Sequence, residues 1–438
     1  MAQSTDYAIE HRERFIVNLM RQEFGRQVIG TSRLGRDSNN FVHLVELAES
    51  VYQPATSSPT VFKPETSSLL AGTTKVVIRI SNPQAMLNED VRVQNEVAAM
   101  CLMRQALSTY KDRLIPNTYA WRSSKESYGW ILQEYMTGVQ PDKVFHGLDR
   151  DHKQDILHQI ADVFKLIQSY SLPESVKGYG GLAFNESGEI VTGPTTIPCG
   201  GPFSEFHEMY MQMLRRQLIE SDTSERIAGW RRNDLRDRLE RFATNGIAKQ
   251  VRENSIARQT LVHGDFSQSM SKLYNGKSTQ VDQALDTFNM LFDPTSNRLT
   301  ALLDFDLSHI ATPADEYFYS FRTVGALLAG PFEEGDEGQL RRCLLDGFDG
   351  NVPDQNGREV NFEIAQMMDK EFVRAGVLRP ADIKGAGELA ALKWFLEDVS
   401  PPYFFMSRWL AHMEPEKVDE MKTSIEENLG KYLERWGF

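Results

Sequence analysis

The fold of this chain is decided by the stretch Thr260-Leu261-Val262-His263-Gly264-Asp265-Phe266 and by Leu299-Thr300-Ala301-Leu302-Leu303-Asp304-Phe305-Asp306, roughly forty residues later. In both stretches a short apolar run, with the composition of a strand, ends at an acidic residue. Phosphoryl-transfer enzymes use acids at the ends of neighbouring strands to place a hydroxyl-orienting base beside a metal ligand. We therefore expect Asp265 and Asp304 to lie in one site.

A third polar residue, Asn289, lies between the two acids and directly precedes the apolar run Met290-Leu291-Phe292. Mg²⁺ binds oxygen ligands, which an Asn amide and an Asp carboxylate supply, and phosphate oxygens can complete its octahedron. The three residues therefore predict a catalytic loop followed by a magnesium ligand. The tripeptide His263-Gly264-Asp265 alone is not specific, because a turn beside a buried, hydrogen-bonded His has the same sequence.

The composition is that of an ordinary globular protein. Of the 438 residues, 41% are hydrophobic and 25% are charged, which excludes a fibrous or largely disordered chain. The net charge of −13 argues against nucleic-acid binding, because a phosphate backbone would be repelled. A cationic small molecule would be tolerated better. No apolar run approaches the length of a membrane span.

Two further features bear on the compartment. The three cysteines, Cys101, Cys199 and Cys343, lie far apart without a CxxC pair, as expected of free thiols in a reducing environment. Residues 1–14 are polar and include three acids, which fits neither a secretory signal nor a transit peptide. We therefore expect a cytoplasmic protein.

The pattern along the chain changes near residue 137. Residues 1–136 are rich in strand-like runs, and they also contain helical patterns at 13–29, where Gly30 is expected to end the helix, and at 88–108. The expected strands are 41–47, 75–80, 117–122 and 129–136. Residues 48–74 are rich in Ser, Thr and Pro and predict a long loop.

Residues 137–438 have mainly helical patterns. A helix is expected from Asp149 onward and another after Pro415, which suits the first turn of a helix. Between them, residues 178–203 are rich in Gly and Pro and are expected to be irregular. The whole pattern predicts an α+β fold with a small N-terminal antiparallel-sheet lobe and a larger, mainly helical C-terminal lobe.

The motif centred on Asp265 resembles the aminoglycoside phosphotransferase and choline kinase-like family, which has a protein-kinase-like two-lobe fold. The resemblance covers about residues 30–400 and is sharp between 261 and 320. It implies that Asp265 is the catalytic Asp, that Asn289 and Asp304 bind Mg²⁺, and that His263 braces the loop.

The same resemblance extends to the turn that follows the second acid. Residues 310–317, IATPADEY, match the family's turn into the helical subdomain, where Asp315 would cap a helix or support the scaffold. Asp306 could be a second metal-facing acid, although an outward position on the turn is the stronger expectation.

In the small lobe the resemblance implies a nucleotide site. The segment 35–41, GRDSNNF, would cover the phosphates, with Ser38 and Asn39 in place of a glycine run. A plain turn explains this composition almost equally well. Arg79 stands where such enzymes usually have Lys, and it would neutralise the phosphates while pairing with Glu96. The alternative is a surface arginine on a strand.

The expected hinge between the lobes comprises Gln133, Glu134, Tyr135 and Met136, whose backbone groups would bind adenine. A plain strand end is the alternative here.

An insertion separates the catalytic Asp from its expected partner. The family places Asn five residues after the Asp, and removal of residues 267–285, which are 19 residues, restores HGDFDTFNMLFD. Either this segment bulges outward and Asp286 to Asn289 return to the usual place, or it is a translated, unspliced intron. We favour the second explanation of its origin. A long surface loop costs little closure entropy, but a displaced metal ligand would impair catalysis.

These observations predict a small-molecule kinase that uses ATP and Mg²⁺ to phosphorylate a hydroxyl of a small acceptor. Acidic charge and the family resemblance favour an acceptor that bears an amine. No nucleic-acid or membrane partner is expected. The main alternative is a pseudokinase-like module that binds nucleotide without transfer. A protein kinase is a weaker third possibility, because no activation segment separates Asp304 from the helical tail.

Overall fold

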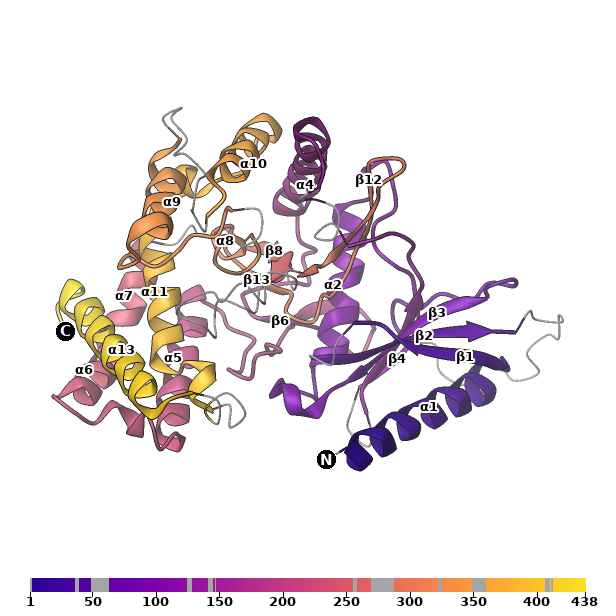
Figure 1. Ribbon diagram of the computed structural model, residues 1–438, viewed down its shortest axis with the longest axis horizontal. Coiled ribbons are helices and arrows are strands. Elements are labelled where there is room, and N and C mark those ends of the chain that lie inside the picture. The colour runs from indigo at the N-terminus through magenta and orange to yellow at the C-terminus, as the bar shows by residue number, and fades with distance from the viewer. Residues whose placement is uncertain are drawn as a thin grey trace.

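The computed structural model describes residues 2–35, 39–48, 63–123, 128–140, 145, 147–254, 258–268, 287–321, 325–348, 360–405, 410 and 413–438. A sheet with one long helix along it forms one end of the molecule, and a group of helices forms the other (Figure 1). The expected α+β fold, with a small antiparallel-sheet lobe and a larger helical lobe, is confirmed.

The small lobe contains a five-stranded sheet in the order β1-β2-β3-β5-β4, in which every neighbouring pair is antiparallel. Its strands are β1 (Val28–Arg33), β2 (Asn40–Leu47), β3 (Lys75–Ser81), β4 (Thr118–Arg122) and β5 (Trp130–Glu134). Side chains alternate across β3. Val76, Ile78 and Ile80 pack with residues of helix α1 (Ala2–Phe24), which leaves Val77 and Arg79 for the opposite face, where helix α2 (Arg92–Ala106) lies.

The first helix differs from its expected bounds. It begins at Ala2 and ends at Phe24, so the expected end at Gly30 is wrong. Gly25 follows the helix with a φ of +60°, a left-handed conformation that commonly ends helices and that glycine adopts without strain. Gly30 instead pairs with Glu46 in the sheet.

The large lobe is built mainly from helices. They are α4 (Arg150–Ser169), α5 (Phe206–Thr223), α6 (Leu235–Arg241), α7 (Ile247–Asn254), α8 (Glu316–Tyr319), α9 (Gly335–Asp346), α10 (Phe362–Ala375), α11 (Ala386–Val399) and α13 (Pro415–Arg435). The expected start of α4 is confirmed, because the Asp149 carboxylate accepts a hydrogen bond from the His152 N–H at 2.9 Å and thereby caps the helix. Helices α4 and α10 pack together at the top of Figure 1.

A hairpin occupies part of the segment expected to be irregular. Strands β6 (Gly181–Phe184) and β7 (Ile190–Gly193) pair antiparallel between residues 178 and 203. Their glycines permit close backbone approach: a Cβ on Gly181 would lie 2.1 Å from the Pro194 carbonyl oxygen, and one on Gly193 would lie 2.8 Å from the Ala183 Cβ. The glycines that suggested a loop therefore serve close packing within a hairpin.

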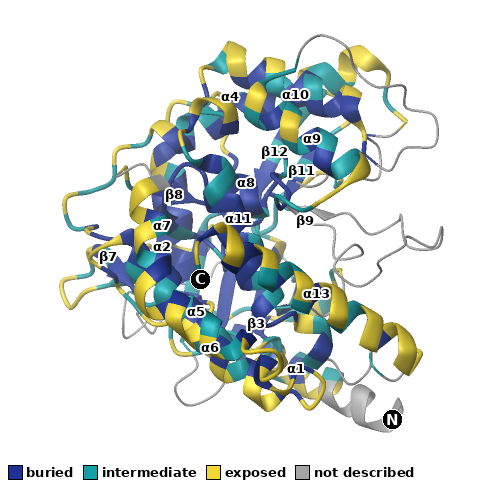
Figure 2. Ribbon diagram, turned by 90° about the vertical axis from the view of Figure 1, so that its left-hand side faces the viewer, coloured by how far each residue is buried: buried dark blue, intermediate teal, exposed yellow. Residues whose placement is uncertain are grey.

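Short strand pairs lie between the sheet and the helical group. Strand β8 (Thr260–Val262) pairs with β13 (His309–Ala311), and β11 (Met290–Asp293) pairs with β12 (Arg298–Leu302). Strand β9 (Ser267–Gln268) pairs with β10 (Thr287–Phe288). All three residues of β8 are buried, and β8 is dark blue in Figure 2. A buried strand pair in this place can hold the loops at its ends firmly.

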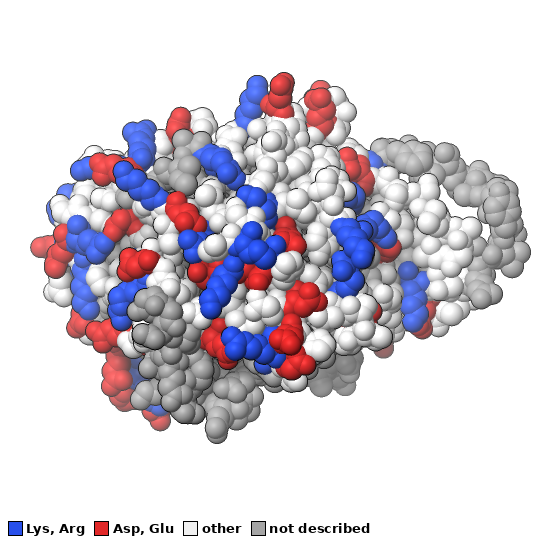
Figure 3. All heavy atoms as spheres, turned by 90° about the horizontal axis from the view of Figure 1, so that it is seen from above, with Lys and Arg blue, Asp and Glu red and all other residues white. Residues whose placement is uncertain are grey.

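Two properties of the outer surface agree with the composition. Within the described ranges, none of the helices combines the length and the apolar character that crossing a membrane requires. On the face drawn in Figure 3, the basic and acidic side chains of the described residues are interspersed.

Candidate active site

Asp265 lies at the tip of a tight turn that follows β8. The preceding Gly264 has a φ of +78°, and a Cβ on it would lie 2.9 Å from the Leu307 carbonyl oxygen. Only glycine suits both the conformation and this close approach. The Asp265 side chain is 5% exposed, and its Oδ1 has no hydrogen-bond partner among the described residues. An unpaired carboxylate oxygen in such a place can accept a hydrogen bond from a ligand.

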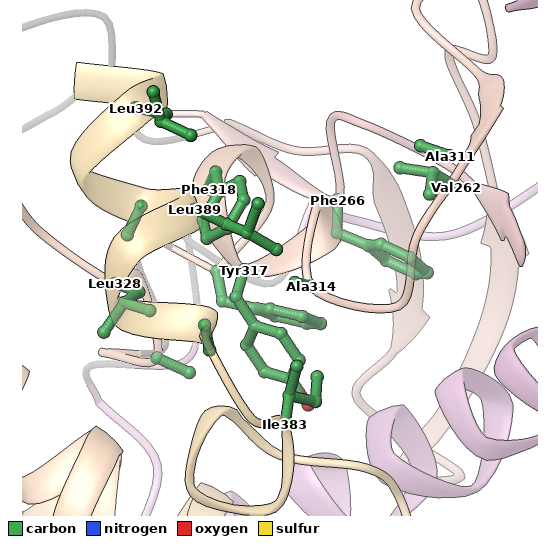
Figure 4. Close-up of a cluster of buried hydrophobic side chains, with 14 of the residues drawn as sticks. Val262, Phe266, Ala311, Ala314, Tyr317, Phe318, Leu328, Ile383, Leu389 and Leu392 are labelled. Atoms are coloured by element: carbon green, nitrogen blue, oxygen red, sulfur yellow. The ribbon is translucent and has the colours of Figure 1, made fainter. Parts of the chain in front are cut away.

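The ring of Phe266 anchors the turn to the core. It stacks with Phe321 at a centroid distance of 5.8 Å and meets Phe164 edge-on at 6.0 Å. Figure 4 shows it beside Tyr317, on the side of the cluster away from the α11 residues Leu389 and Leu392. Because the Phe266 ring is buried, it restricts the backbone of the turn that carries Asp265.

The backbone of the turn is held by a carboxylate that sequence reasoning missed. Glu316 accepts hydrogen bonds from the N–H groups of His263 at 2.7 Å and Gly264 at 2.9 Å, and also from the Ser320 hydroxyl. The Phe266 N–H donates to the Ser320 hydroxyl at 3.1 Å. Glu316 belongs to the segment 310–317 that suggested the family. Nothing in the neighbouring sequence indicates that its carboxylate binds the N–H group of Gly264, 52 residues away.

His263 occupies the bracing position that was expected. Its Nδ1 accepts from the Asp265 N–H at 3.2 Å, so Nε2 carries the hydrogen and donates to the Leu303 carbonyl oxygen at 3.0 Å. Burial lowers the pKa of His263 to about 4, and the ring is therefore neutral near pH 7. It joins the Asp265 turn to the residue that precedes Asp304.

Asn289 lies beside Asp265 despite the insertion. Its N–H donates to the Phe266 carbonyl oxygen at 3.0 Å, and its Nδ2 donates to the Asp265 carbonyl oxygen at 2.6 Å. The Leu303 N–H in turn donates to the Asn289 carbonyl oxygen at 2.8 Å. Asn289 is thus close to Asp265, as the first explanation of the insertion requires. Residues 269–285 of the insertion, and Asp286, lie outside the described residues.

Asp304, in the loop after β12, contacts Arg79 on strand β3 of the sheet. Arg79 donates to Asp304, and its Nε lies 3.1 Å from Glu96 Oε1, so the expected Arg79–Glu96 pair is present. Arg79 is 6% exposed, and the surface-arginine alternative is therefore wrong. Burial alone would raise the pKa of Asp304, but the charge and hydrogen bond of Arg79 hold it below its usual range.

The carboxyls of Asp265 and Asp304 are close enough to influence each other. Burial first, and then the charges of Asp304 and Asp306, raise the pKa of Asp265 well above its usual value. Excess negative charge of this kind favours a cation in the site. Among the described residues no group of three or more His, Cys, Asp and Glu could hold a metal. The set of one Asp, one Asn and phosphate oxygens instead suits Mg²⁺, which keeps few protein ligands.

Asp306 does not point outward. It is fully buried, and its Oδ2 accepts from Asn40 Nδ2 at 3.3 Å and lies 3.5 Å from Arg92 Nη2. Burial, followed by the charges of Asp304 and Glu96, raises its pKa to about 8. The expectation of an exposed turn residue is wrong because α2 and β2 of the small lobe cover this turn, which the local sequence cannot indicate.

The residues expected to bind the nucleotide differ from one another in their contacts with the rest of the protein. Ser38 lies outside the described residues. The Asn39 carbonyl oxygen accepts from Arg92 Nη2 at 2.6 Å, which ties the segment before β2 to helix α2. Gln133 is buried on β5, whereas the Glu134 carboxylate accepts from Arg113 at 2.5 and 2.6 Å. The Glu134 side chain is therefore engaged by another part of the protein.

Tyr135 and Met136 follow directly after β5. Among the described residues, no other backbone group hydrogen-bonds to the backbone of Met136. Beyond them, the Val139 N–H donates to the Phe292 carbonyl oxygen at 2.8 Å, and the Thr300 hydroxyl donates to the Thr137 carbonyl oxygen at 2.6 Å. The segment between the lobes is thus fastened to the β11–β12 hairpin, which carries Asn289 and Asp304 at its ends.

Asp315 supports the scaffold and does not cap a helix through its side chain. It precedes α8, but its carboxylate accepts from the Thr312 N–H at 3.2 Å, the Thr312 hydroxyl at 2.7 Å and the Tyr210 hydroxyl at 3.4 Å. These bonds join the turn to helix α5.

The comparisons with known proteins give remote likenesses only. No protein-family model and no curated protein matches the chain. Among solved structures, the chain is similar to the gentamicin–APH(2")-IIa complex, with a TM-score of 0.47, 12% identity and 94% of each chain covered. It is also similar to ADP-bound aminoglycoside phosphotransferase APH(2'')-Ib, with a TM-score of 0.45, 13% identity, and 95% of this chain and 97% of that chain covered.

A third similar structure is aminoglycoside phosphotransferase APH(4)-Ia, with a TM-score of 0.41, 11% identity, and 95% of this chain and 97% of that chain covered. These structures belong to the family that the motifs resemble. At such TM-scores and identities, function is inferred from the residues of the site alone.

Proposed function

We propose that this protein is a kinase that uses ATP and Mg²⁺ to phosphorylate a hydroxyl of a small-molecule acceptor. One observation carries the proposal: the Asn289 side chain donates to the Asp265 carbonyl oxygen and the Asn289 N–H donates to the Phe266 carbonyl oxygen, while His263 joins the same turn to the residue before Asp304. These contacts support a shared site for Asp265, Asn289 and Asp304, which carry oxygen-bearing side chains of the types that phosphoryl transfer requires.

Asp265 would orient the acceptor and take its proton. The acceptor hydroxyl donates to the carboxylate, and its oxygen attacks the γ-phosphorus while the bond to the β–γ bridging oxygen breaks. ADP leaves with that electron pair, and the hydroxyl proton passes to Asp265 and then to solvent. Asn289 and Asp304 would hold Mg²⁺, which neutralises charge on the β- and γ-phosphates when it is bound.

The small lobe would hold the nucleotide. Arg79 is kept in place by Glu96 and is close to Asp304, so its guanidinium can neutralise phosphate oxygens at the same site. Ser38 and Asn39 would cover the phosphates. The hinge of Gln133, Glu134, Tyr135 and Met136 would bind adenine through backbone groups, and the Met136 backbone supports this because it bonds to no other backbone group among the described residues. This division of roles places the boundary between the lobes after residue 136.

The class of binding partner is inferred from the net charge of the chain. The net charge of −13 and the mixed charges of Figure 3 favour a small acceptor over a nucleic acid, and the charge also favours an acceptor that bears an amine. A cytoplasmic location is part of the proposal, since three cysteines without a disulfide suit a reducing compartment.

The test compares Asp265→Asn with Asp293→Asn. Asp293 lies at the far end of the β11–β12 hairpin, where it accepts hydrogen bonds from the Thr295 N–H and the Ser296 hydroxyl, and Asn can keep this turn. With a panel of alcohols and amino alcohols, ATP consumption by Asp265→Asn should fall by about 10²- to 10⁴-fold. The thermal shift caused by ATP and Mg²⁺ should remain, and Asp293→Asn should behave as wild type.

Equal rates for wild type and Asp265→Asn would refute the assignment. A thermal shift that requires Mg²⁺, without turnover of any acceptor, would instead favour the pseudokinase-like binding module.

A further inference from the structure

A narrow pocket opens beside the turn that carries Asp265. Its walls include Gly264, residues 307–309 after the second acid, Met209 and Met213 of helix α5, and Tyr319 of α8. Its cavity volume is about 50 Å³. Gly264 directly precedes Asp265 in the chain, so a molecule in this pocket would contact the turn that carries the proposed base.

The lining is apolar or neutral. Met209, Met213 and Ile197 provide aliphatic surface, and Tyr319 and His309 provide aromatic rings. No carboxylate belongs to the lining in the described part of the chain. Methionine side chains adapt readily to an apolar ligand, whereas a cation in such surroundings would lose its hydration without gaining a partner.

The acids behind these walls are already engaged. Asp315 accepts hydrogen bonds from Thr312 and Tyr210. Glu397 of helix α11 pairs with Lys393, whose Nζ lies 4.4 Å from the centroid of the Tyr319 ring. Burial first, and then the charges of Asp315 and Glu397, raise the pKa of Tyr319 well above its usual value. Both carboxylates therefore act on this wall of the pocket, although neither of them belongs to the lining.

Two polar groups remain available. Thr196 is 4% exposed, and its hydroxyl has no hydrogen-bond partner among the described residues. His309 Nδ1 lies 2.9 Å from the Leu307 carbonyl oxygen. A carbonyl oxygen can only accept, so Nδ1 carries the hydrogen and a neutral ring presents Nε2 as an acceptor. An uncharged polar group of a ligand could bind to either of them.

We propose that this pocket binds the acceptor and selects an alcohol whose buried body is slender, apolar and uncharged. The inference rests on the proposed kinase function and narrows its substrate class. A polycationic acceptor does not suit the lining, and an amine on the acceptor would have to remain outside the pocket. Thr196 and His309 would orient a second neutral oxygen of the acceptor.

The first experiment compares two acceptors of equal size with ATP and Mg²⁺. Hexan-1-ol and 2-(propylamino)ethanol differ only in a CH₂ group that is replaced by a charged amine in the middle of the chain. Wild type should show at least tenfold higher kcat/KM for hexan-1-ol. Met213→Glu should reverse this preference, because it adds a carboxylate to the lining. Met211→Glu, on the same helix but outside the lining, should keep it.

A second readout does not need turnover. Cys199 lines the pocket, whereas Cys343 lies on α9. Hexan-1-ol should slow the alkylation of Cys199 relative to that of Cys343, and 2-(propylamino)ethanol should not. Both rates can be followed by mass spectrometry of the intact wild-type chain.

The outcomes separate the two proposals. Protection of Cys199 by hexan-1-ol without phosphorylation of any acceptor would support the pocket and refute the kinase. Phosphorylation with equal or better use of the amine, or with a preference that Met213→Glu does not change, would overturn the pocket proposal and keep the kinase.

Discussion

Glu316 illustrates how one side chain can hold the turn that carries the proposed base. Its two oxygens accept from the N–H groups of His263 and Gly264 and from the Ser320 hydroxyl. Burial nevertheless raises its pKa to about 7, because the hydrogen bonds offset only part of the cost of burying the charge. The site is therefore held by a carboxyl that titrates near neutral pH.

Glu316→Gln is expected to change how stability depends on pH. The folded-state pKa of about 7 lies above the ordinary value, so this group's stabilisation is complete below about pH 4.3 and is lost as the pH rises to about 7. The loss is at most about 1.4 kcal/mol per pH unit. Relative to Glu316→Gln, the unfolding free energy of wild type in urea should fall between pH 5 and 7 and run parallel above pH 8.

Glu253→Gln is the control, because Glu253 is exposed and pairs only with Lys249 on its own helix. A wild-type curve that stays parallel to the Glu316→Gln curve from pH 5 to 8 would contradict the raised pKa.

At the scale of elements, a small strand pair explains how the insertion is accommodated. Strands β9 and β10 bring the two ends of the inserted segment side by side, with Thr287 opposite Gln268 and Phe288 opposite Ser267. Phe266 and Asn289 then meet through a backbone hydrogen bond. A long loop closed in this way costs little entropy and leaves the geometry at its base unchanged.

Deletion of residues 267–285 removes β9 but leaves both Phe266 and Asn289, whose backbone groups can still bond across the shortened loop, and it is expected to keep the fold and the activity. The shorter loop should raise the free energy of unfolding by on the order of 1 kcal/mol, because less closure entropy is lost on folding. Chemical denaturation and the acceptor assay check both expectations. Loss of ATP consumption in a folded deletion variant would show that the segment contributes to the site.

The origin of the segment is a separate question. Sequencing of the spliced transcript answers it, since a message that encodes residues 267–285 would exclude the intron hypothesis.

At the scale of the whole molecule, the two lobes are joined by a buried polar contact from helix α2. Asn95 Nδ2 donates to the carbonyl oxygens of Ser308 at 2.9 Å and Asp306 at 3.3 Å, and Asn95 Oδ1 accepts from the Leu182 N–H at 2.6 Å. Arg92 lies one turn before Glu96 and reaches Asp306. The helix that positions Arg79 through Glu96 is thus tied directly to the loop that carries Asp304.

Asn95→Ala is expected to lower the free energy of unfolding by about 2–5 kcal/mol, because it leaves three buried backbone groups of the large lobe without the partner that the small lobe supplies. It should also weaken the thermal shift caused by ATP and Mg²⁺, because their proposed site includes residues of both lobes. Asn185→Ala is the matched control, since the Asn185 side chain is exposed and bonds only within its own turn. Equal melting temperatures for the two variants would refute the role of this contact.

The sequence alone determined the features that depend on neighbouring residues. Alternation along 75–80 predicted a strand, Asp149 and Pro415 marked helix starts, and the acids after two apolar runs predicted a shared site. These patterns are local, because strand alternation, helix caps and strand ends are decided by a few consecutive side chains.

The tertiary structure alone decided the features that depend on residues distant in the sequence. It returned Asn289 to Asp265, buried Asp306 under the small lobe and gave Glu316 its role in the turn. Part of the glycine-rich segment 178–203 also forms a hairpin. The residues next to a carboxylate, an amide or a glycine are the same whether that group faces water or the backbone of another element. Only the packing of distant elements decides which partner the group has.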